Sequence, residues 1–180
     1  MKYFLPFAIA LLTVCSAFAQ QDSGAPLSPP EIATGAIAGK TITIHYSAPS
    51  VRGRKIFGPD GIVMNDSTAP IWRAGANTST SFHTDANLLI GGLAVPHGDY
   101  TLYVNVKNPD AWELIINKQT GQWGLTYDAS QDLGRLKMQM SKPAATIERL
   151  KYTVSSAGGN KGKLTMDWEN HIASVPLEVR

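Results

Sequence analysis

The sequence predicts an all-β protein, a single antiparallel β-sandwich of the immunoglobulin-like or jelly-roll type with two long loops. Three observations lead to this prediction. Apolar and polar residues alternate in about nine short segments, as they do in half-buried strands. Clusters of Gly, Pro, Asn and Asp, which favour turns, separate these segments. No window keeps an apolar stripe at helical spacing over three turns.

The first clear strand is expected at 41–46, where Ile42, Ile44 and Tyr46 share one face. The other alternating segments are 102–106, 112–116, 135–140, 150–154, 164–168 and 175–179, with weaker ones at 79–84 and 87–90. Two long irregular stretches, 47–70 and 118–134, remain between strands. Loops of this length in a compact domain usually carry function or specific packing.

The first nineteen residues are typical of a secretory signal peptide. Lys2 supplies a positive charge, residues 4–14 are mostly apolar, and Ala17-Phe18-Ala19 offers small residues at the cleavage site. An apolar run of about eleven residues is too short for a bilayer core that needs about 20. We therefore expect cleavage after Ala19 and an exported protein, periplasmic or secreted, with no integral membrane segment after cleavage.

An alternative N-terminal processing is lipidation of Cys15, because Leu12-Thr13-Val14-Cys15 resembles a bacterial lipoprotein box. The β-branched Val14 fits the position before the cysteine poorly, which favours the site after Ala19.

The mature chain is expected to have a flexible lead-in over 20–30, which is polar and rich in proline, and one β-sandwich domain over 31–180. Cleavage removes the one cysteine of the chain, so the domain must be held by its apolar core without disulfides. It also leaves 15 basic residues against 14 acidic ones, so no strong field exists to attract nucleic acid. We expect no nucleic-acid partner.

Two loop segments hold the candidate ligand-binding residues. Arg54 belongs to the basic run Arg52-Gly53-Arg54-Lys55, which could present guanidinium groups to a carboxylate, phosphate or sugar acid. A solvated basic loop is the alternative. In the second segment, Trp72 and Arg73 point to opposite faces if the chain is extended. A bend at Gly75 and Asn77, which tolerate a left-handed backbone, would then gather Arg73, Asn77 and Thr80 on one rim. The alternative is an arginine that holds loop carbonyls.

Several motifs resemble those of a known family. They are, in order, 46–54 (Tyr-Ser-Ala-Pro-Ser-Val-Arg-Gly-Arg), 56–58 (Ile-Phe-Gly), 72–77 (Trp-Arg-Ala-Gly-Ala-Asn) and 96–102 (Pro-His-Gly-Asp-Tyr-Thr-Leu), then Trp112, Asn117-Lys118, Trp123-Gly124 and Trp168. In this order they resemble domain-of-unknown-function family 2911, which consists of exported bacterial proteins. The resemblance implies export and a single domain, and it supplies no catalytic residues. The link 59–70 is longer and more polar here than in the family.

The remaining histidines and tryptophans give weaker signals. His83 and Asp85 lie two residues apart on an expected strand and could share a metal, although a surface turn is the simpler interpretation. Trp112 and Trp168 fall on apolar strand faces and are expected in the core. Trp123, in a loop between glycines, is the best candidate for a ring that stacks on a ligand. No motif indicates a metal site or a cofactor, and we expect neither.

The leading interpretation is an exported, non-catalytic module that binds a small polar, anionic or carbohydrate ligand through Arg54, Arg73, Asn77, Thr80 and Trp123. A hydrolase acting on a sugar or carboxylate ester, with Arg73, Asn77 and Asp128 gathered at one end, is the first alternative. A structural envelope protein whose edge strands pair with a partner is the second.

Overall fold

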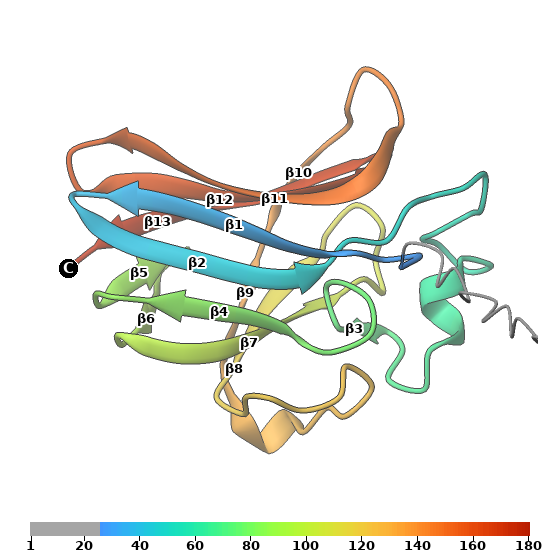
Figure 1. The fold of residues 1–180 in the computed structure, drawn as a ribbon, viewed down its shortest axis with the longest axis horizontal. Helices are drawn as coiled ribbons and strands as arrows, with labels where there is room; N and C mark the ends of the chain where they lie inside the picture. Colours follow the sequence, from blue (N-terminus) through green and yellow to red (C-terminus); the bar gives the residue numbers. More distant parts are fainter. Residues whose placement is uncertain (1–25) are drawn as a thin grey trace, which may run out of the picture.

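The computed structural model describes residues 26–180, which form two antiparallel sheets packed face to face (Figure 1). The expected all-β sandwich is thereby confirmed. The first sheet has the order β1 (Pro30–Ile37), β2 (Lys40–Ser47), β4 (Thr80–Thr84), β7 (Gly98–Asn105), β8 (Glu113–Asn117) and β9 (Asp132–Lys137), with β3 (Ile71–Trp72) paired to the end of β7. The second has the order β11 (Ile147–Gly158), β12 (Lys161–Glu169), β13 (His171–Val179), β5 (Leu88–Ile90) and β6 (Leu93–Val95), with β10 (Gln139–Ser141) paired to β13.

Each alternating segment of the sequence overlaps a strand, although Ser79, Asn87 and Trp112 lie just outside the strands they precede. In β2, Ile42, Ile44 and Tyr46 are buried in the core as expected. The segment expected at 135–140 is divided into β9 and β10 at Met138, whose N–H donates to the Trp112 carbonyl at 2.9 Å instead of continuing the ladder. Strands β1, β3 and β6 were not predicted from the sequence.

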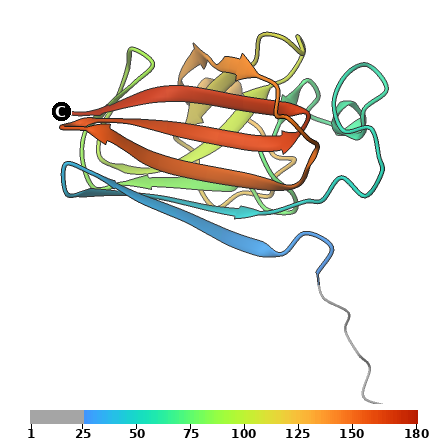
Figure 2. The ribbon, with the colours of Figure 1, turned by 90° about the horizontal axis from the view of Figure 1, so that it is seen from above.

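β1 closes one side of the sandwich, where it runs next to β11 of the other sheet (Figure 2). The two strands approach so closely that a Cβ added to Gly35 would lie 2.5 Å from the Val154 carbonyl oxygen. This position therefore has room only for glycine. Before β1, the Pro29 carbonyl accepts a hydrogen bond from the N–H of Ala48 at 2.8 Å, so the chain leading into the strand is paired with the end of β2.

The loop 48–70 lies at the end of the sandwich opposite the C-terminus and contains the short 3₁₀ helix η1 (Ile62–Asn65) (Figure 1). Phe57 anchors this loop in an aromatic cluster of the core. Its ring packs edge-on against Trp72 and Trp168, with centroid distances of 5.4 and 5.6 Å, and those two indoles stack at 5.5 Å. The loop is thus packed specifically, as its length predicted.

The loop 118–131, with the 3₁₀ helix η2 (Ala129–Gln131), folds over the outer face of the first sheet. The Tyr103 hydroxyl on β7 donates to the Thr126 carbonyl at 2.7 Å, and Gln122 Nε2 donates to the Tyr103 oxygen at 3.0 Å. These bonds hold the loop against β7. Within residues 26–180, no helix is long and apolar enough to cross a membrane.

Candidate functional site

The chain bends sharply after β3 and separates two side chains that follow each other in sequence. Trp72 is buried in the core and donates from Nε1 to the Gly75 carbonyl at 3.0 Å, whereas the Arg73 side chain is partly exposed and pairs with Asp66; both residues line one cavity. The left-handed residues of the bend are Ala74 (φ 55°) and Asn77 (φ 60°). Gly75 tolerates a left-handed backbone but does not adopt one; a glycine is needed here for space, because a Cβ would lie 2.7 Å from Thr80 Oγ1.

The cavity beside Arg73 has a volume of about 300 Å³ and lies between the loop 48–70 and the bend after β3. We call it the arginine cavity. The side chains with polar groups among its lining residues are Ser28, Arg52, Arg54, Asp66, Trp72, Arg73, Asn77 and Trp168. Three guanidinium groups and one carboxylate give this lining a formal charge of +2. The structure thus brings Arg54, Arg73 and Asn77 together in one cavity.

Arg73 is held in the wall of the cavity with much of its hydrogen-bonding capacity unused. Its Nη1 lies 3.3 Å from Asp66 Oδ2 and its side chain is only 16% exposed. That contact is an ion pair whose geometry does not make a hydrogen bond, and the buried Nε has no hydrogen-bond partner among the described residues. A buried donor without an acceptor costs about 1–3 kcal/mol. Arg73 therefore keeps hydrogen-bonding capacity that the described part of the chain does not use.

Trp168 adds another donor of the same kind. Its side chain is 3% exposed and lines the arginine cavity, and its Nε1–H is buried without an acceptor within the described part of the chain. Buried indole N–H groups usually have a partner. The sequence assigned Trp168 to the core, which is where its ring lies, but it gave no indication that the ring also borders a cavity with Arg73.

Arg54 and Arg52 are tied in part to the loop that carries them. Arg54 donates from Nη2 to the Ser50 carbonyl at 2.6 Å and from Nε to the Val51 carbonyl at 3.1 Å. Arg52 donates from Nη2 to the Leu27 carbonyl at 2.9 Å. These bonds shape the loop, and the positive charge of both groups still contributes to the potential in the cavity.

Thr80 and Trp123 do not line the arginine cavity. Thr80 is fully buried and its hydroxyl donates to the Ala74 carbonyl at 3.0 Å, which holds the bend together. Trp123 is 54% exposed and its backbone bridges to Thr78. The next residue, Gly124, lies so close to the bend that a Cβ would be 2.3 Å from Arg73 Cδ. The loop 118–131 therefore packs against the side chain of Arg73.

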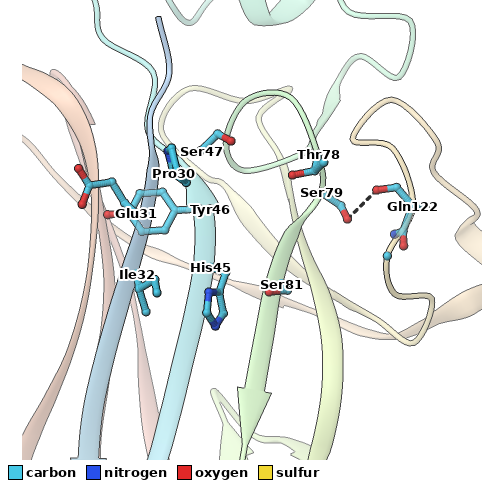
Figure 3. Close-up of a pocket in the computed structure, with 11 residues that line it drawn as sticks. Pro30, Glu31, Ile32, His45, Tyr46, Ser47, Thr78, Ser79, Ser81 and Gln122 are labelled. Atoms are coloured by element: carbon cyan, nitrogen blue, oxygen red, sulfur yellow. Dashed lines mark hydrogen bonds between the residues drawn. The ribbon is translucent and has the colours of Figure 1, made fainter. Parts of the chain in front are cut away.

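A second, larger cavity of about 540 Å³ opens on the outer face of the first sheet (Figure 3). Its floor is formed by Ile32, His45 and Ser81, which are neighbours across β1, β2 and β4. One wall is formed by Thr78, Ser79 and Gln122, and the Ser79 hydroxyl donates to the Gln122 carbonyl at 3.0 Å. We call this cavity the hydroxyl trough.

A pair formed by the buried Glu169 and the half-buried His171 lies at the β12–β13 turn. Glu169 has a left-handed backbone (φ 54°), and its Oε1 accepts a hydrogen bond from the Ile56 N–H at 2.9 Å. Its other oxygen lies 3.2 Å from His171 Nδ1, and the His171 ring stacks on Trp112. Burial lowers the pKa of His171 below its ordinary value, although the Glu169 carboxylate acts in the opposite direction. Glu169 thereby ties the loop 48–70 to the second sheet.

His83 and Asp85 hydrogen-bond to each other. His83 Nε2 lies 3.0 Å from Asp85 Oδ1, and Nδ1 lies 2.7 Å from Asp99 Oδ1. Hydrogen bonds to these two carboxylates, with Asp99 the stronger influence, raise the pKa of His83 above its ordinary value. Both ring nitrogens are thus engaged, and within residues 26–180 no group of three His, Cys, Asp or Glu side chains is placed to hold a metal ion.

Asp128, the acid considered for hydrolysis, caps η2 by accepting hydrogen bonds from the N–H and hydroxyl of Ser130 at 2.9 and 2.7 Å. It does not line the arginine cavity with Arg73 and Asn77. The three groups of the hydrolase alternative are therefore not gathered in that cavity.

Comparison with known proteins gives one positive result. No curated protein and no solved structure matches the chain. A family model described as "Protein of unknown function (DUF2911)" matches residues 28–177. These residues include both cavities except for Leu27, and they extend from just before β1 into β13. The chain therefore belongs to the DUF2911 family of proteins of unknown function.

Proposed function

We propose that this protein is an exported, non-catalytic binding module whose arginine cavity binds the carboxylate of a small polar ligand. One observation carries the proposal. Arg73 Nε and Trp168 Nε1 belong to residues that line one cavity and are buried donors without acceptors in the described part of the chain, and Arg73 Nη1 has only its 3.3 Å ion pair with Asp66. Carboxylate oxygens are acceptors only, so they complement these donors.

The charge of the cavity supports an anion over a neutral ligand. A guanidinium group can donate two parallel hydrogen bonds to a carboxylate, a geometry that lysine lacks. Asp66 balances only part of the positive charge, because Arg52 and Arg54 line the same cavity. Asn77 adds an exposed side-chain amide that can hydrogen-bond to a hydroxyl next to the carboxylate.

The partly enclosed position of the donors favours a small ligand group. A carboxylate that enters the cavity exchanges water for hydrogen bonds in a region of low dielectric, where charge-assisted bonds are strong. Export, which places the protein among extracellular small molecules and glycans, is supported by the signal-peptide pattern of residues 1–19.

Titration calorimetry with glucuronic acid tests this function. We expect Arg73→Lys to keep the fold and the charge but to weaken binding by about tenfold or more, because the bidentate geometry is lost. Arg180→Lys is the matched control, since Arg180 is exposed and pairs with Glu178 at 3.2 Å outside the cavity. The control should bind as the wild type does.

Stability measurements on the same variants separate binding from a structural role. If Arg73 served mainly as the partner of Asp66, Arg73→Ala would cost about 3–5 kcal/mol, the range for breaking a buried ion pair. We expect a smaller loss, because the 3.3 Å contact of Nη1 with Asp66 does not form a hydrogen bond and Nε has no acceptor to lose. Wild-type protein that binds no carboxylate, together with a large loss of stability in Arg73→Ala, would refute the proposal.

A further inference from the structure

We propose that the arginine cavity and the hydroxyl trough form one groove that binds an acidic oligosaccharide. A single uronic acid residue would occupy the arginine cavity, and the neutral sugars attached to it would lie in the trough. The inference depends on the proposed function for its acidic end and adds a substrate class and a second subsite.

The two cavities follow each other along the same three stretches of chain. The N-terminal stretch contributes residues 27–28 to the arginine cavity and 30–32 to the trough. The end of β2 contributes Pro49 to the first and residues 45–47 to the second. The bend after β3 contributes residues 75–77 to the first and 78–79 to the second. These three shared stretches make the cavities neighbours, and the ridge between them consists of the bend, whose Ala76 N–H donates to the Ser47 carbonyl at 3.2 Å, and the paired Pro29 and Ala48.

Exposed apolar side chains are concentrated at this groove. Within residues 26–180, the large hydrophobic side chains that are exposed to solvent are Leu27 (71%), Ile32 (62%) and Trp123 (54%). Leu27 lines the arginine cavity and Ile32 lies on the trough floor, whereas Trp123 lines neither cavity and is the residue after the trough residue Gln122. Sugar rings have apolar C–H faces that pack on such side chains, with an aromatic ring as the best surface.

The polar groups of the trough suit neutral sugars. Hydroxyls of Ser47, Thr78, Ser79 and Ser81 and the imidazole of His45 can each both donate and accept, whereas the Gln122 amide already donates to Thr101 and Tyr103. Glu31, the one carboxylate among the lining residues, points away from His45 to the other side of β1 (Figure 3). The trough therefore has no charged group at its floor, in contrast to the arginine cavity.

A carbohydrate fits the trough better than a peptide does. Extended peptides gain affinity mainly by adding a strand to a free sheet edge. The trough lies on the face of the sheet, where β2 is already paired with β1 on one side and β4 on the other. Side chains are the groups left to hydrogen-bond a ligand there, and hydroxyl-rich ligands match them.

Three saccharides test the groove by calorimetry: glucuronic acid, xylotriose, and the acidic tetrasaccharide in which one 4-O-methylglucuronic acid is linked to xylotriose. We expect the tetrasaccharide to bind the wild-type protein about tenfold or more tighter than glucuronic acid. Ser81→Trp, which fills the trough, should reduce the affinity for the tetrasaccharide to that for glucuronic acid without changing the latter. Thr165→Trp is the matched control, since Thr165 is a half-buried residue on β12 of the other sheet.

A second variant keeps the test decisive if Ser81→Trp does not fold. Trp123→Ala removes a mostly exposed ring and should weaken the tetrasaccharide alone, whereas Arg73→Lys should weaken both acidic ligands. If glucuronic acid binds but the tetrasaccharide binds no tighter, the groove is refuted and the carboxylate site stands. If no acidic ligand binds, the proposed function falls and the groove with it. An acidic peptide, Gly-Gly-Gly-Asp, that binds more tightly than the tetrasaccharide would overturn the carbohydrate assignment.

Discussion

Replacing Glu169 should reveal how the loop that carries Arg52 and Arg54 is held in place. Glu169 is buried at the β12–β13 turn, and its carboxylate accepts a hydrogen bond from the N–H of Ile56, itself fully buried in that loop. A hydrogen bond to a charged group contributes about 1.5–3 kcal/mol. Glu169→Ala removes the acceptor and leaves the Ile56 N–H unpaired. We expect this variant to lose about 1.5–3 kcal/mol of unfolding free energy.

Two further substitutions at Glu169 separate the hydrogen bond from the backbone conformation. Glu169 has φ 54°, a left-handed conformation that costs a non-glycine residue about 1–2 kcal/mol. Glu169→Gly loses the same hydrogen bond but relieves this cost, so it should be about 1 kcal/mol more stable than Glu169→Ala. Glu169→Gln keeps an amide oxygen that can accept from the Ile56 N–H, and it should be the least destabilised of the three.

Urea unfolding followed by tryptophan fluorescence measures these differences, because the buried indoles near Phe57 report on the aromatic cluster. The expected order of stability is wild type, Glu169→Gln, Glu169→Gly and Glu169→Ala. A Gln variant as unstable as the Ala variant would refute the hydrogen bond as the source of the effect. Equal stability of the Gly and Ala variants would refute the backbone contribution.

Two other predictions concern protonation and export. The flanking carboxylates raise the pKa of His83, so the folded state binds the proton more tightly than the unfolded chain does. This stabilisation should be complete below a pH of about 6.5 and be lost as the pH rises through the folded pKa. An NMR titration should show His83 titrating above, and His171 below, about 6.5; the reverse order would contradict the placement of both rings. Mass spectrometry of the exported protein should give a mature N-terminus at Gln20, whereas a lipidated Cys15 as first residue would contradict it.

The strands could be predicted because alternation is a local property of the sequence. Each of the expected segments buries one face against the opposite sheet, so its apolar residues recur at every second position. β1 escaped prediction since most of its residues are small and only its last residue, Ile37, is fully buried. One signal for it was available in Gly39, which forms a turn with Ala38 in which both residues have a positive φ.

The candidate site could be predicted only in part. Loop composition singled out Arg54, Arg73 and Asn77, and the structure places all three at one cavity. The same reasoning missed Asp66 and Trp168. Asp66 lies in the polar link 59–70, which shows no strand or motif pattern, and Trp168 was assigned to the core. A strand pattern shows which face a side chain takes, but it does not show which loop covers the end of that face.

The sequence by itself determined the fold class, the positions of most strands and the family, because these depend on local periodicity and on motifs read in order. The tertiary structure decided which donors lack acceptors and which cavities adjoin. Those properties arise where the loop 48–70, the bend after β3 and β12 meet, at residues far apart in the chain. Whether a hydrogen bond forms, and how a cavity is shaped, changes when the distance between two such segments changes by a few tenths of an ångström. Only the packing of the two sheets sets those distances.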